Sequence, residues 1–79
     1  MRGKLPSLSS QRLIAALRHA GFEDAPRPGK GSHRALMRRD EDGRVRLVIV
    51  PERQDLPRGT LNAILQQAGL TADELADLL

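Results

Sequence analysis

The chain has 79 residues, a formal net charge of +3 and no cysteine. This length leaves room for one core, so we expect residues 1–79 to fold as a single domain. Without cysteine it can form neither disulfides nor cysteine zinc sites, and its two histidines show no metal-ligand spacing. The longest apolar run, residues 47–50, is too short to span a membrane, and no hydrophobic stretch follows the N-terminal charges. We therefore expect a cytoplasmic protein that uses no metal, cofactor or membrane.

Positive charge is concentrated in the first two thirds of the chain. Residues 1–22 hold four basic residues and no acidic one, whereas residues 51–79 hold five acidic residues and two basic ones. A basic surface favours a polyanion such as a nucleic acid, although charge alone fits a solvated basic surface equally well. Only one residue is aromatic, which leaves little surface on which single-stranded bases could stack.

Residues 9–20 are predicted to form the first helix. Ser9 or Ser10 can cap its N-terminus, its apolar residues fall on one face, and Gly21 can end it in a left-handed conformation. Phe22 should then pack back onto the last helical turn. Residues 1–7, which precede this helix, are expected to be a flexible lead.

Three strands are expected next. Two prolines, Pro26 and Pro28, each remove a backbone donor, so any strand within residues 22–32 is short and lies at a sheet edge. Residues 33–39 and 44–50 flank a turn-forming sequence and should form a hairpin.

Alternation in these strands predicts which side chains face the core. Val45, Leu47 and Ile49 share one face of the second hairpin strand, and we expect that face to pack under the helices. The opposite face would then meet solvent and carry four arginines, which are Arg34, Arg38, Arg44 and Arg46. The expected result is a basic sheet surface.

Two helices complete the chain. Residues 60–68 have apolar residues at helical spacing, and Gly69 closes the helix. Thr71-Ala72-Asp73-Glu74 is a capping box that starts a short helix within residues 71–79. The predicted order is α-β-β-β-α with a short C-terminal helix, and its simplest packing is an α+β two-layer domain with a three-stranded antiparallel sheet.

The segment Lys30-Gly31-Ser32-His33 is the best candidate for chemistry. A histidine can take and return a proton near neutral pH, and glycine lets a phosphate approach the backbone. In RNA cleavage a base removes the 2′-OH proton while cations stabilise charge that grows on the phosphoryl oxygens. By spacing alone, however, a single histidine at the start of a strand is more often structural or simply exposed.

Charged and small residues around His33 are the candidate RNA ligands. Flanking cations can hold a phosphate, and a solvated basic face is the alternative for the more distant arginines. The candidates are Lys30, Gly31, Ser32, Arg34, Arg38 and Arg46. Contacts of this kind are independent of sequence, so they cannot provide specificity.

The order of several short motifs resembles the HicA family, the mRNA interferase toxins of HicA–HicB toxin–antitoxin pairs. The resemblance covers residues 8–70, with residues 71–79 as an added helix. The motifs, in order, are Ala20-Gly21-Phe22, Lys30-Gly31-Ser32-His33, Val48-Ile49-Val50-Pro51, Asp55-Leu56, Gly59-Thr60-Leu61 and Gln67-Ala68-Gly69-Leu70.

The resemblance carries expectations for fold and function. It implies a double-stranded-RNA-binding-like fold, metal-independent cleavage of mRNA with His33 as the catalytic residue, and a HicB-type antitoxin that covers this histidine. Oligomers could form through the antitoxin. The alternative is a non-catalytic module that binds the RNA phosphate backbone, which would account for the arginines but give His33 no role.

Overall fold

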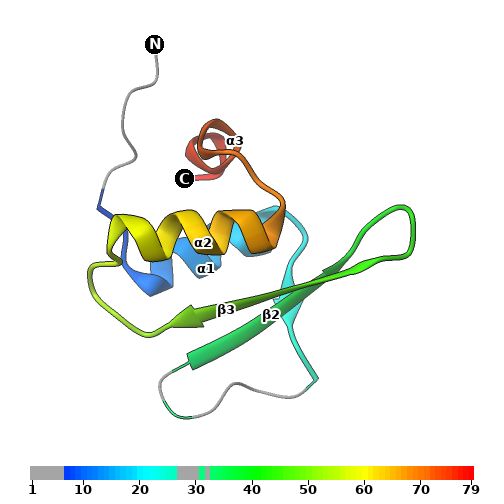
Figure 1. Ribbon diagram of the computed structural model, residues 1–79, viewed down its shortest axis with the longest axis horizontal. Helices are drawn as coiled ribbons and strands as arrows, with labels where there is room; N and C mark the ends of the chain where they lie inside the picture. Colours follow the sequence, from blue (N-terminus) through cyan, green and yellow to red (C-terminus); the bar gives the residue numbers. More distant parts are fainter. Residues whose placement is uncertain (1–6, 27–30, 32) are drawn as a thin grey trace.

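The computed structural model describes residues 7–26, 31 and 33–79, so nearly all of the predicted lead, residues 1–7, lies outside the described part. Its elements form one sheet and three helices (Figure 1). In chain order they are α1 (Ser10–His19), β1 (Glu23–Asp24), β2 (His33–Arg39), β3 (Val45–Pro51), α2 (Arg58–Ala68) and α3 (Ala72–Leu78). The strands are antiparallel in the order β1-β2-β3. The predicted α+β fold, with the order α-β-β-β-α of a double-stranded-RNA-binding-like domain, is confirmed.

The helix ends follow the capping residues. Ser9 is the N-cap of α1, and its hydroxyl accepts a hydrogen bond from the Arg12 amide at 3.2 Å. Gly69 ends α2 with φ +71, and Thr71 and Glu74 form a complete capping box at α3. α2 begins at Arg58, two residues before the predicted start at residue 60.

The strands match the expected hairpin and edge strand. β1 has only two residues and pairs with β2 at the sheet edge, Glu23 opposite Met37. β2 and β3 pair along their full length, from His33 opposite Pro51 to Arg39 opposite Val45. The short β1 is consistent with the nearby prolines, because a proline cannot donate to a ladder.

The core lies between the sheet and the helices. α1 and α2 lie over one face of the sheet, and α3 packs against α1 on the side away from the strands (Figure 1). Phe22 is 2% exposed, and its amide donates to the Leu17 carbonyl at 3.0 Å, which confirms the predicted contact with the last turn of α1. The strands contribute three fully buried side chains to this core, which are Leu36, Val48 and Val50.

The prediction of which sheet face is buried was wrong. Val45, Leu47 and Ile49 do share a face, but this face points away from the helices, and they are 50%, 53% and 36% exposed. The helix-facing positions are Val48 and Val50, which are 0% exposed. By the pairing register, the arginines at 34, 38 and 46 lie on the helix-facing side and not on an exposed basic sheet surface.

The reason lies in the composition and length of β3. β3 carries apolar residues on both of its faces, so alternation by itself does not identify which face is buried. The hairpin also extends beyond the ends of the helices (Figure 1). Arg38 and Arg46 can therefore lie on the helix-facing side at this end without being buried, and their long side chains reach a carboxylate there.

Candidate functional site

His33 stands at the start of β2 on the outer face of the sheet, which is the face turned away from the helices. Its partner across the ladder is Pro51, the last residue of β3. The residue is exposed, and its ring has no hydrogen-bond partner among the described residues. An exposed imidazole without a partner is free to meet a substrate and to exchange a proton with it.

The segment before His33 is described only at one residue. Lys30 and Ser32, two of the predicted RNA ligands, lie outside the described residues. Gly31 is exposed with φ +60, and a Cβ built there would have no neighbour within 4 Å. The backbone at Gly31 is thus open to an approaching group, as a phosphate contact would require.

Arg34 follows His33 but faces the other side of the sheet. Its guanidinium donates to Asp24 Oδ1 at 3.1 Å, and Arg18 donates to the same oxygen at 3.0 Å. The hydrogen bond from Arg34, followed by that from Arg18, lowers the pKa of Asp24 below its ordinary value. The Arg34 side chain remains 42% exposed, so it can still reach a phosphate at this end of the sheet.

Arg38 is held by contacts within the protein. Its guanidinium donates to Asp40 Oδ1, from Nε at 3.3 Å and from Nη2 at 3.2 Å, and to the Ala20 carbonyl at the end of α1 at 3.1 Å. It also lies over the Phe22 ring, 4.9 Å from the centroid. These contacts secure the hairpin to α1.

Arg46 makes the corresponding link to α2. Its Nε donates to Asp40 Oδ2 at 2.7 Å. Its guanidinium lies directly over Gly69 at the end of α2, where a cation is favourable to the helix dipole. We call Arg38, Arg46 and Asp40 the Asp40 network. The network lowers the pKa of Asp40, with the Arg46 hydrogen bond as the largest cause.

The structure therefore does not bring all the predicted ligands together. Arg38 is five residues from His33 along β2, which corresponds to about 16 Å, and the pairing register places Arg46 opposite Arg38. Of the predicted cations that the structure describes, Arg34 alone lies next to His33. The sequence could not reveal this division because it depends on where Asp40 lies.

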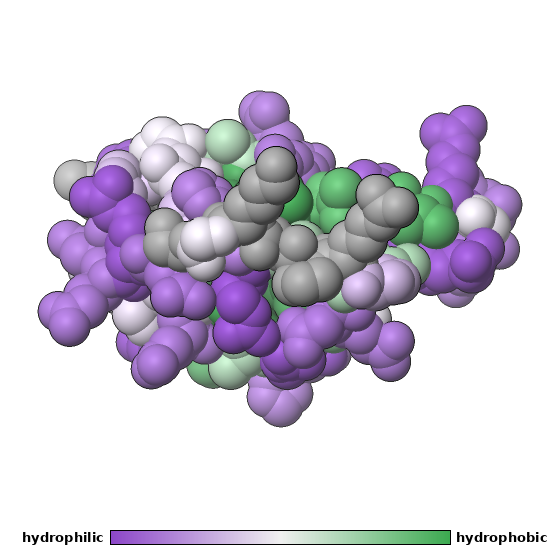
Figure 2. Space-filling view, turned by 90° about the horizontal axis from the view of Figure 1, so that it is seen from below, coloured by the Kyte–Doolittle hydropathy of each residue, from purple (hydrophilic) through white to green (hydrophobic). Residues whose placement is uncertain are grey.

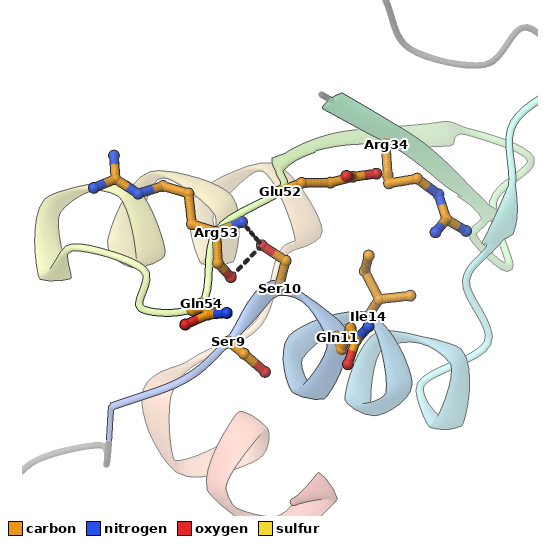
Figure 3. Close-up of a pocket in the computed structure, with 8 residues that line it drawn as sticks. All are labelled: Ser9, Ser10, Gln11, Ile14, Arg34, Glu52, Arg53 and Gln54. Carbon is orange, nitrogen blue, oxygen red and sulfur yellow. Dashed lines mark hydrogen bonds between the residues drawn. The ribbon is translucent and has the colours of Figure 1, made fainter. Parts of the chain in front are cut away.

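A pocket opens at the same end of the sheet as His33. We call it the α1 pocket; it has a volume of about 400 Å³ and lies between the start of α1, Arg34 and the loop after β3 (Figure 3). The residues that line it are Ser9, Ser10, Gln11, Ile14, Arg34, Glu52, Arg53 and Gln54. The loop residues follow Pro51, the ladder partner of His33, so the pocket and the histidine lie at the same end of the sheet.

A buried serine fixes the shape of this pocket. Ser10 is 4% exposed, and its hydroxyl accepts a hydrogen bond from the Arg53 amide at 2.6 Å (Figure 3). The hydroxyl also donates to the Pro51 carbonyl. The Ser10 amide also donates to the Arg53 carbonyl at 2.9 Å. Sequence reasoning missed the pocket because these contacts join segments more than forty residues apart.

The outer face of the sheet is apolar beyond His33. Met37, Val45, Leu47 and Ile49 share this face, and we call them the outer apolar strip. Figure 2, which views the molecule from the sheet side, shows hydrophobic surface beside the charged tip of the hairpin. Aliphatic surface of this kind suits a protein partner better than a phosphate backbone.

The described part of the chain contains neither a metal-binding cluster nor a membrane-spanning helix. No three His, Cys, Asp or Glu side chains gather there in a way that could hold a metal ion. None of the helices described is long and apolar enough to cross a membrane.

Comparison with known proteins adds to the geometry. The family profile described as "HicA toxin of bacterial toxin-antitoxin" matches residues 10–70, from the first residue of α1 to just beyond α2. The chain belongs to the HicA toxin family. The resemblance inferred from the short motifs is thereby confirmed, and the matched segment includes β2 with His33 and the Asp40 network. A search of curated proteins finds no match.

Membership of the HicA family defines a general role. The protein is a toxin of a toxin–antitoxin system, and such a system includes an antitoxin partner. α3, at residues 72–78, lies outside the matched segment. It is nevertheless part of the fold, because Leu75 is fully buried in the common core.

Proposed function

We propose that this HicA toxin is a metal-independent endoribonuclease that cleaves mRNA with His33 as its general base, its general acid, or both in turn. The observation that carries this proposal is the position of His33. His33 is exposed at the start of β2, its ring has no hydrogen-bond partner among the described residues, and Gly31 and Arg34 lie within two residues of it in the chain. The histidine is therefore accessible to RNA.

The reaction follows from an imidazole beside a phosphodiester. His33 takes the proton from a ribose 2′-OH as that oxygen attacks phosphorus, the new P–O2′ bond forms, and the bond to the 5′-oxygen breaks. The departing 5′-oxygen takes up a proton, which can come from Lys30, Ser32, the RNA itself, a second subunit or the protonated imidazole. Lys30 and Arg34 are proposed to stabilise charge on the phosphoryl oxygens, and the Gly31 and Ser32 backbone to contact the phosphate.

For Arg38 and Arg46 the contacts point to a different role. Both form ion pairs with Asp40, and each lies against a helix end. We propose that they hold the hairpin in place, and that any contact they make with RNA is peripheral to the cleavage site.

The neutralising partner is proposed to be a HicB-type antitoxin that covers His33. The outer apolar strip lies on the same sheet face as His33, and its members Leu47 and Val45 are about half exposed. A protein that buries this strip would extend over the histidine and exclude RNA. The partner would thus add apolar contact area to a domain that is small for an independent core.

The test compares two histidine variants on RNA in EDTA. His33→Ala should lower the cleavage rate by at least about a hundredfold, since general acid–base groups contribute that much or more. His19→Ala is the matched control, because His19 is also exposed but lies at the end of α1. Circular dichroism verifies that both variants fold.

The same assay distinguishes the proposed nuclease from a non-catalytic RNA-binding module. If wild type cleaves RNA and His33→Ala retains that cleavage, His33 has no part in the mechanism. Binding without any cleavage by wild type would favour a non-catalytic RNA-binding module. Cleavage that EDTA abolishes would overturn metal independence.

A further inference from the structure

The α1 pocket has the properties of a binding site, and the phosphate contacts proposed around His33 give it no role. Its volume of about 400 Å³ is at the small end of the range for ligand pockets, which suits a single nucleotide better than a duplex. It lies at the His33 end of the sheet, and Arg34, the residue after His33, forms part of its wall. His33 and the pocket thus lie at the same end of the sheet, with His33 on its outer face and Arg34 on its helix-facing side.

The polar groups of the pocket suit a base rather than a phosphate. Glu52 extends along the pocket toward Arg34, whereas the Arg53 side chain extends away from the other lining residues (Figure 3). A carboxylate in the pocket repels a phosphate but accepts hydrogen bonds from an exocyclic amino group of a base.

Two glutamines widen this hydrogen-bonding capacity. Gln11 on α1 and Gln54 in the loop after β3 are exposed, and neither side chain has a hydrogen-bond partner among the described residues. A glutamine amide can pair with a base edge as donor and acceptor together. Ile14 gives one wall of the pocket an apolar surface against which a flat base can lie.

Hydrogen bonds hold in place the loop that carries Glu52 in the pocket. Ser10 binds the backbone of Pro51 and Arg53, which fixes the loop that carries Glu52 against the first turn of α1. Phe22, the one Phe, Tyr or Trp residue, is buried in the core, and no aromatic side chain lines the pocket, so a base there is recognised at its edge.

We propose that the α1 pocket binds a nucleobase with an exocyclic amino group, next to the phosphodiester that His33 cleaves, and so gives the toxin its sequence preference. The inference rests on the proposed function, since it assigns a subsite of the same reaction. Glu52 accepts from the amino group, Gln11 and Gln54 bond the remaining edge, and Arg34 lies between the base and the scissile phosphate.

The first experiment measures binding without cleavage. Fluorescence anisotropy with His33→Ala protein compares hexauridylate with hexamers in which one uridine is replaced by cytidine or adenosine. Uracil has no exocyclic amino group, so the substituted hexamers should bind about tenfold more tightly. Adding Glu52→Ala, which removes the acceptor, should remove this difference, and Glu41→Ala at the hairpin turn should leave it unchanged.

The second experiment maps cleavage sites on a long RNA. Gln11→Ala and Gln54→Ala should shift the relative use of favoured and disfavoured sites by about tenfold, while Gln66→Ala, an exposed glutamine on α2, keeps the wild-type pattern. Equal affinity for all hexamers together with an unchanged cleavage pattern in the pocket variants would overturn the proposal. If wild type cleaves nothing, the nuclease assignment fails, and the hexamer affinities still decide whether the pocket selects a base.

Discussion

Asp40 connects the β2–β3 hairpin, through two arginines, to the C-terminal ends of α1 and α2. Its carboxylate accepts from Arg46 at 2.7 Å and from Arg38 at 3.2 Å, and these arginines reach Gly69 and the Ala20 carbonyl. One carboxylate thus neutralises two cations that would otherwise repel each other across the ladder.

The lowered pKa of Asp40 predicts a dependence of stability on pH. Because the folded-state pKa lies below the ordinary value of 3.8, the ionised carboxylate stabilises the fold above that pH, and this stabilisation is lost as the pH falls through the folded-state pKa. Asp40→Asn should therefore have a lower urea midpoint than wild type at pH 7, and the difference should shrink below about pH 4.

Urea denaturation at pH 7, 5, 4 and 3 measures this effect. Asp55→Asn, at an exposed loop residue without a described ion pair, is the control and should follow the wild-type profile. A gap between Asp40→Asn and wild type that stays constant from pH 7 to pH 3 would contradict the prediction.

Gly69 permits a second test at the level of one residue. It has φ +71, and a Cβ at this position would lie 2.6 Å from the Arg46 guanidinium. Gly69→Ala should lower the free energy of unfolding by about 1–2 kcal/mol because L residues are strained in the left-handed region. Gly59→Ala, inside α2 with open space around its Cβ position, should be neutral or stabilising. Equal effects of the two substitutions would disprove the role assigned to Gly69.

At the scale of elements, β3 is the strand that carries two surfaces. Val48 and Val50 on one face complete the core, while Val45, Leu47 and Ile49 on the other belong to the outer apolar strip. It is also an edge strand, and the Ile49 amide donates to Gln67 Oε1 on α2 at 3.2 Å. This hydrogen bond occupies one edge amide that is not paired with β2.

The outer face of β3 leads to a prediction about the antitoxin. Leu47→Glu places a charge in the strip, where Leu47 is 53% exposed and contributes little to the core. We expect the variant to fold and to cleave RNA, but to bind a HicB-type antitoxin at least about tenfold more weakly, since burying an unpaired charge is costly.

Isothermal titration calorimetry with the antitoxin gives the affinity. Leu79→Glu is the matched control, because Leu79 is also exposed but lies at the C-terminus beyond α3. Unchanged antitoxin affinity of Leu47→Glu would show that the strip is not part of the interface.

At the scale of the molecule, more than half of the described arginines are paired with carboxylates. Five of the described arginines form ion pairs with Asp24, Asp40 or Asp42. The described arginines without a described ion pair are Arg12, Arg39, Arg53 and Arg58. These four lie in α1, at the end of β2, in the loop after β3 and at the start of α2.

This arrangement predicts a shallow salt dependence of RNA binding. If one to three phosphates are neutralised, log affinity should fall against log salt with a slope of about −0.7 to −2 for single-stranded RNA. Anisotropy titrations of His33→Ala protein with hexamers at 50–300 mM salt measure the slope. A slope of about −3.5, which corresponds to neutralisation of all five phosphates of a hexamer, would contradict this expectation.

The local features of this fold could be predicted from the sequence. Ser9 and Thr71 cap helix starts with their side chains, and Gly69 ends α2 because it has no side chain. The hairpin turn likewise depends on residues that are adjacent in the chain. The candidate histidine was found in the same way, because the motif around His33 is contiguous. Such features need only neighbours in the chain, so their physical causes can be seen in the sequence.

The tertiary structure alone decided which face of the sheet is buried, which arginines are held by carboxylates, and where a pocket forms. β3 has apolar residues on both faces, and the choice between them depended on how α1 and α2 pack against Val48 and Val50. Arg38 and Arg46 became structural because Asp40 lies within reach, and the α1 pocket exists because Ser10 binds a loop forty residues away. These outcomes depend on contacts between distant segments, whose energies are set only when the whole chain has folded.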